Sequence, residues 1–75
     1  MTQVRVFVNA VALDVNLGAT ALDCVQAWKA DEAASVRQGA RLITDSRGLP
    51  IPNDSPASAG SIYRTVSNRS SARDD

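Results

Sequence analysis

"GATALDCVQAW", residues 18–28, contains the only cysteine and the only tryptophan of this 75-residue chain. Gly18 interrupts the preceding apolar run, and Thr20 stands three residues before Asp23, which is close to the capping-box pattern of a helix start. At about 100° per residue, one apolar stripe then runs along the expected helix, made of Ala21, Val25 and Trp28. The stretch therefore predicts an amphipathic helix that packs on a sheet.

Cys24 is the residue of this stretch that most resembles a reactive group. It lies in the first helical turn, where the helix dipole favours a thiolate, but it flanks the apolar stripe and has no adjacent base. We interpret Cys24 as a small buried residue and Trp28 as a core residue rather than a stacking platform. The chain has no histidine and one cysteine, which excludes imidazole catalysis and a Cys/His zinc site. We expect no enzyme, cofactor or metal.

Strands precede the helix. Residues 3–9 alternate apolar and other residues, and 11–15 repeat the pattern, which is typical of half-buried strands. Asn9 and Ala10 lie between the two runs, so we expect a tight β-hairpin.

The chain after the helix predicts three more elements. Residues 29–39 either continue the helix or form a second one, and we expect a break near Ala30–Asp31, with Asp31 as N-cap and Gly39 just past the end. Residues 40–45 and 61–67 read as strands. Leu49 and Ile51 suggest a short edge strand, confined there by Pro50 and Pro52.

These elements indicate one α+β domain over residues 1–67, followed by a disordered tail at 68–75. The order β-β-α-β-(β)-β, with a mixed sheet of four to five strands on one main helix, predicts the β-grasp (ubiquitin-like) arrangement. In that arrangement the first and last strands are parallel neighbours at the centre of the sheet. The valines of residues 4–8, with Ile62 and Val66, suit such central strands.

Two segments also resemble a known group of proteins. Gly18 to Asp23, together with Asp54 to Ile62, is similar to the ubiquitin-like sulfur carriers of thiamine and molybdopterin biosynthesis and to the TGS domain of threonyl-tRNA synthetases and related GTPases. The resemblance implies the β-grasp fold. Sulfur carriers act through a C-terminal Gly-Gly, whereas the last glycine here is Gly60, so their catalytic role passes to no residue of this chain.

Composition and charge limit the cellular compartment and the kinds of partner that we expect. Eight basic and eight acidic residues cancel, which argues against a strongly electrostatic partner. A single thiol, no visible signal segment and no long apolar run predict a cytoplasmic protein that does not enter membranes. Arginines gather in the second half of the chain, at 37, 41, 47, 64, 69 and 73. They leave RNA contact open as an alternative.

A partner surface is expected on the sheet face opposite the helix. Strand alternation places Phe7 and Tyr63 there as an aromatic patch, although two scattered surface aromatics remain an alternative. The same alternation puts Arg64 on the Ile62 side, where we expect it to pair with Asp45 or to lay its stem on apolar surface. The candidate surface comprises Phe7, Tyr63, Arg5, Arg41, Arg47 and Arg64.

The favoured function is thus a non-enzymatic interaction or accessory module that docks on a larger protein. The alternatives are a TGS-like RNA-contacting module and a sulfur-carrier-like protein with a degenerate C-terminus. The chain is expected to be a monomer or a weak homo-oligomer.

Overall fold

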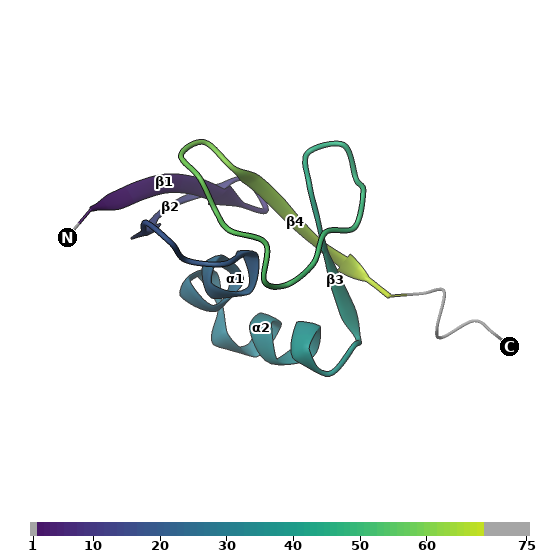
Figure 1. Ribbon diagram of the computed structural model, residues 1–75. Helices are drawn as coiled ribbons and strands as arrows, with labels where there is room; N and C mark the ends of the chain where they lie inside the picture. Colours follow the sequence, from purple (N-terminus) through teal and green to yellow (C-terminus); the bar gives the residue numbers. More distant parts are fainter. Residues whose placement is uncertain (1, 69–75) are drawn as a thin grey trace, which may run out of the picture.

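A computed structural model describes residues 2–68, and the predicted tail lies outside these residues from position 69 on. Along the chain the elements are β1 (Gln3–Val8), β2 (Val11–Asn16), α1 (Ala21–Trp28), α2 (Ala30–Arg37), β3 (Arg41–Thr44) and β4 (Ile62–Ser67), as Figure 1 shows. None of the described helices has the length and apolar character needed to cross a membrane.

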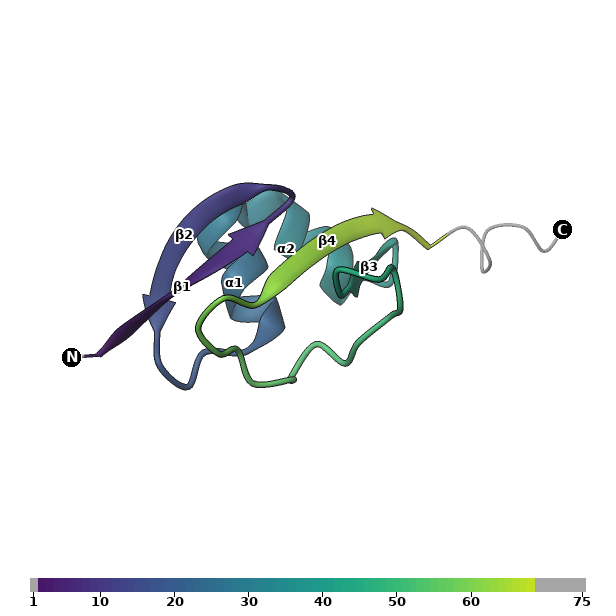
Figure 2. The same ribbon diagram turned by 90° about the horizontal axis from the view of Figure 1, so that it is seen from above.

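The four strands form one mixed sheet in the order β2-β1-β4-β3. The central pair, β1 and β4, is parallel, as expected for the first and last strands, and both outer pairs are antiparallel. The central pairing is short, because it joins only Phe7 to Ile62 and Val8 to Tyr63. Both helices lie on one side of the sheet (Figure 2), so the fold is α+β with a two-layer arrangement.

The predicted N-terminal hairpin is confirmed. Val8 pairs with Val11, and the two residues between them have left-handed backbones, with φ of 50° at Asn9 and 71° at Ala10. Two consecutive positive φ values are the mark of a type I′ turn, whose twist matches that of a hairpin. The alternation also holds, since Val6 and Val8 are fully buried under the helices.

The start of α1 is the predicted capping box. The Asp23 N–H donates to Thr20 Oγ1 at 3.1 Å, and the Thr20 N–H donates to Asp23 Oδ2 at 3.0 Å. The next two free N–H groups of the helix bond to the loop before β4: Ala21 donates to the Ser55 carbonyl at 2.8 Å and Leu22 to the Asn53 carbonyl at 3.0 Å. The helix N-terminus is therefore fully satisfied within the chain.

The expected break between two helices is confirmed, but the second helix is as long as the first, whereas one main helix was expected. The break lies at Lys29, whose backbone is extended, and the prediction of Asp31 as N-cap is wrong. Asp31 instead lies in the first turn of α2, where a carboxylate also complements the helix dipole. The aspartate therefore marks the start of the helix, but the N-cap lies two residues before it. The C-terminal prediction is confirmed: Gly39 has φ of 84° and its N–H donates to the Val36 carbonyl.

The core fills the space between the sheet and the two helices. Its fully buried members include Val6, Val8, Cys24, Val25 and Ile43. The short edge strand expected at Leu49–Ile51 does not form. Prolines on both sides of Ile51 leave one isolated bridge between Thr44 and Pro50. The Ile51 N–H donates to the Ile43 carbonyl at 2.9 Å, and the Asp45 N–H donates to the Leu49 carbonyl at 3.0 Å.

Candidate functional site

The sheet face opposite the helices is the candidate site. The strand registers place Phe7 beside Ile62 on the central strands, and Leu42 beside Val66 toward the β3 edge. Neither helix covers this face (Figure 2). Its apolar members therefore lie partly in solvent, with exposed fractions of 45% for Ile62 and 39% for Val66. We call this set, Phe7, Leu42, Ile62, Arg64 and Val66, the outer face.

The placement of Tyr63 on this face is wrong. Tyr63 is only 4% exposed and belongs to the core, because its parallel pairing with Val8 turns it toward the helices. Strand β4 thus has the opposite phase to the one expected. In this phase the Arg64 side chain lies in water, so its charge is not desolvated. Thr65 points inward instead, and its hydroxyl donates to Glu32 at 2.7 Å.

The expected pairing of Arg64 with Asp45 is wrong as well. Arg64 is exposed, and the ion pair of Asp45 is with Arg47 at 3.4 Å. The Leu49 and Arg47 N–H groups also donate to the Asp45 carboxylate, at 3.1 and 2.8 Å. These bonds, that from Leu49 first, hold the pKa of Asp45 below its usual value. The Asp45 carboxylate therefore binds groups of its own loop and not Arg64.

A shallow depression opens on the outer face beside the hairpin turn. Its volume is about 550 Å³, and its lining residues are Phe7, Asn9, Ala10, Ile62 and Arg64. The lining is mostly apolar and includes one cation. Such a surface suits an apolar side chain of a partner with a carboxylate close to it.

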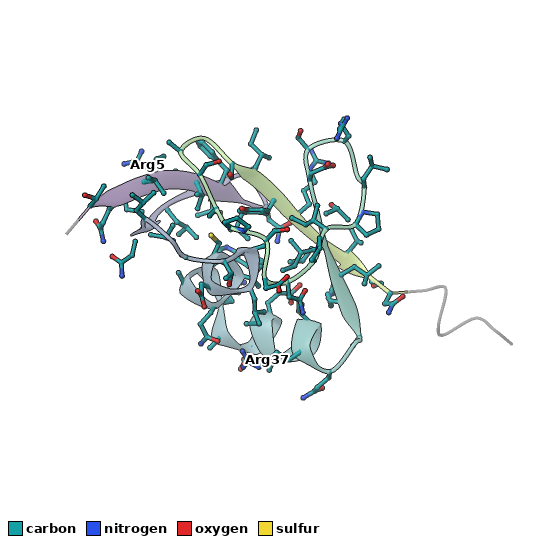
Figure 3. The ribbon with its side chains drawn as sticks, viewed as in Figure 1. Arg5 and Arg37 are labelled. Carbon is teal, nitrogen blue, oxygen red and sulfur yellow. The ribbon has the colours of Figure 1, made fainter. Side chains whose placement is uncertain are left out.

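The arginines within residues 2–68 do not gather on one surface. Figure 3 shows Arg5 on the sheet side of the molecule and Arg37 on the helix side. Arg5 donates to Asp14 at 2.7 Å, which raises the pKa of Arg5 and lowers that of Asp14. Arg41 lies 3.2 Å from Glu32. Within residues 2–68, Arg64 forms no ion pair, and it alone among the predicted surface arginines lies beside the depression.

Cys24 packs in the core, as interpreted from the sequence. It is fully buried, and the loss of solvation, with a smaller contribution from the charge of Asp23, raises the pKa of its thiol. A raised pKa makes the thiolate scarce, which is the reverse of what a nucleophile needs. Trp28 also packs against the core, half-buried, with the Lys29 ammonium 4.9 Å from its ring centroid.

Metal-binding chemistry has no support in the described part of the chain. No group of three or more cysteine, aspartate or glutamate side chains that could hold an ion forms among residues 2–68.

Sequence reasoning named Phe7, Arg5, Arg41, Arg47 and Arg64 as members of a partner surface, but it missed Ile62 and Val66 as exposed residues. The cost of burying Arg64 was the signal that could have found them.

Comparison with known proteins adds no relative. The chain matches no protein-family model, and neither the curated proteins nor the solved structures give a match.

Proposed function

We propose that this protein is a β-grasp domain that works as a non-enzymatic interaction module, docking on a larger protein through the outer face. The central parallel pair of β1 and β4, with both helices on one side, supports the β-grasp assignment. The assignment leaves function open, because one fold can carry many tasks. The proposed docking role is argued instead from the exposed residues of the outer face.

The observation that carries the proposal is the uncovered apolar row of the outer face. Ile62 and Val66 lie four residues apart on the same side of β4, with Arg64 between them, and Phe7 lies beside Ile62 on the next strand. A single exposed apolar residue is ordinary on a protein surface, but adjacent ones around a depression mark an interaction site. Burial of apolar surface contributes about 25 cal/mol per Å², so this row favours a protein partner.

The arginine pattern supports a protein partner over RNA. RNA binding by phosphate contacts needs several cations free on one face. Here Arg41 and Arg47 are engaged in ion pairs, and Arg37 donates to Gln26 at 3.3 Å. Among the described residues, Arg64 alone offers a cation beside an apolar depression, which fits one carboxylate of a protein partner.

The test compares two variants that add the same charge. Ile62→Asp places a carboxylate in the outer face, whereas Leu49→Asp places one on a loop residue of similar exposure, 53%. Each tagged variant is crosslinked in its native cell and recovered, and co-purified proteins are quantified by mass spectrometry. We expect a protein that is recovered with the wild type and with Leu49→Asp, and at least tenfold less with Ile62→Asp.

Thermal unfolding checks that both variants fold. Equal recovery with Ile62→Asp, or no protein enriched by the wild type, would contradict the proposal.

A further inference from the structure

The two edges of the sheet differ in how they are protected. At the β3 edge the following loop covers the strand: the Ile43 carbonyl accepts the Ile51 N–H at 2.9 Å, and the Asp45 N–H donates to the Leu49 carbonyl at 3.0 Å. Pro50 lies within this covering loop. Natural proteins protect sheet edges in this way because open edges pair with other strands.

Within residues 2–68, no loop covers the β2 edge in this way. Val8 and Val11 close the two-residue hairpin, and the Leu17 N–H donates to the Thr2 carbonyl at 3.0 Å, so the odd-numbered residues of β2 bond to β1. The N–H and C=O groups of Ala12 and Asp14 consequently point away from β1. Among the described residues none bonds to these groups. Strand β2 also contains no proline or lysine that would block pairing.

We propose that two copies of this chain pair through their β2 strands in an antiparallel, two-fold symmetric dimer. In the register that pairs all of these free groups with one another, Ala12 of each copy lies opposite Asp14 of the other, and the two-fold axis passes between the two Leu13 residues. Ala12 and Asp14 then exchange both backbone hydrogen bonds with the second copy, and the two sheets become one.

The side chains favour this register on both faces. On the helix side, Leu13 meets Leu13, and Val11, which is 44% exposed in the single chain, meets Val15 of the second copy. On the other side each Asp14 faces an alanine and keeps its own bond to Arg5 at 2.7 Å. A register centred on Asp14 would set two carboxylates directly opposite each other, which is destabilising.

On the helix side, a hollow at this edge can receive part of the second copy. A hollow of about 530 Å³ lies at this edge, and its lining includes Val15, Leu17, Asp23 and Ala27. The hairpin turn of the second copy comes to lie beside Leu17 in the proposed register. This edge is separate from the outer face, so the dimer does not rest on the function proposed above.

The first experiment measures oligomeric state. Sedimentation velocity is recorded on the full chain from about 1 to 300 μM, a range that covers weak association. We expect the wild type to shift from monomer to dimer mass, and Val11→Lys to raise the dimer dissociation constant at least tenfold. Leu49→Lys, a control of similar exposure away from β2, keeps the wild-type constant. A wild type that stays monomeric, or a Val11→Lys variant that dimerises equally well, overturns the proposal.

The second experiment tests the register. Non-hydrogen-bonded antiparallel pairs have Cα atoms about 4.5 Å apart, which a disulfide can span. Leu13→Cys therefore crosslinks to itself on oxidation, whereas Ala12→Cys, which faces Asp14, does not. Cys24 is fully buried and stays out of the reaction. Crosslinking of Ala12→Cys as efficient as that of Leu13→Cys, or no crosslinking of a folded Leu13→Cys, overturns the register and with it the dimer.

Discussion

Asn9 and Thr65, from opposite ends of the described chain, are joined by two hydrogen bonds. The Thr65 N–H donates to Asn9 Oδ1 at 3.1 Å, and Asn9 Nδ2 donates to Thr65 Oγ1 at 3.0 Å. Strand β1 ends at Val8, so the Asn9 side chain takes the place of a further strand residue beside β4. The bonds continue from Thr65 to Glu32 at 2.7 Å, and Glu32 lies 3.2 Å from Arg41. One polar chain thus connects the hairpin turn, β4, α2 and β3.

Removal of the Asn9 side chain should be costly for so small a domain. Asn9→Gly keeps a residue that tolerates positive φ but leaves the half-buried Thr65 N–H unsatisfied, so we expect a loss of about 1–3 kcal/mol in the free energy of unfolding. A double-mutant cycle with Thr65→Val, followed by urea denaturation, should give a coupling energy of about 0.5–3 kcal/mol. Additive effects of the two substitutions would show that the pair is not coupled.

Replacement of Ala10 by glycine should stabilise the folded protein. Its φ of 71° strains a residue that has a Cβ by about 1–2 kcal/mol, whereas glycine adopts this conformation freely. Glycine also loses more entropy on folding, which offsets part of the gain. We expect Ala10→Gly to raise the free energy of unfolding by about 0.5–1 kcal/mol. Ala12→Gly, in regular strand two residues on, should lower it, and a loss at both positions would contradict the strain at Ala10.

Cys24 should react only when the protein opens. Its thiol is fully buried, and burial raises its pKa, so both access and thiolate are lacking in the folded state. Labelling with a disulfide reagent should be slow in buffer and fast in urea, with the rate following the unfolded fraction. Rapid labelling of the folded protein would place Cys24 at an accessible site.

Acid should weaken the loop that Asp45 organises. Hydrogen bonds from Leu49 first, and from Arg47, lower the pKa of Asp45 in the folded state. The lowered pKa stabilises the protein above the unfolded value of about 3.9, and this stabilisation is lost as the pH falls through the folded value. Asp45→Asn retains an acceptor oxygen but does not titrate. Its free energy of unfolding should therefore decline less between about pH 5 and pH 2 than that of the wild type.

The measurement for Asp45 is urea denaturation at a series of pH values, together with an NMR titration of the carboxyl carbon. An identical acid dependence in the variant would assign the loss of stability to other carboxylates.

The elements that sequence reasoning predicted well carry local signals. The hairpin follows from alternation and from Asn9-Ala10, and the start of α1 from the spacing of Thr20 and Asp23. Each signal involves residues that touch each other within a few positions. Such signals can be read without knowledge of the rest of the fold.

The phase of β4 was predicted wrongly because distant residues decide it. Either phase of β4 leaves large apolar residues on both faces, and the choice depends on Val8, which sets Tyr63 inward, and on Glu32, which binds Thr65. Neither is near β4 in sequence. The outer face was therefore predicted in position but not in membership: Phe7 and Arg64 lie on it, and Ile62 takes the place assigned to Tyr63.

The short pairing of Phe7 with Ile62 and of Val8 with Tyr63 also dictates the order in which the molecule can assemble. During synthesis the hairpin and both helices emerge first, but the centre of the sheet stays open until β4 has been made. Closing that long loop is the slow event, because its entropy is lost before any contact between the two strands is gained. Until then Val6 and Val8 lack part of their cover, so the nascent chain is most exposed to aggregation just before β4 is added.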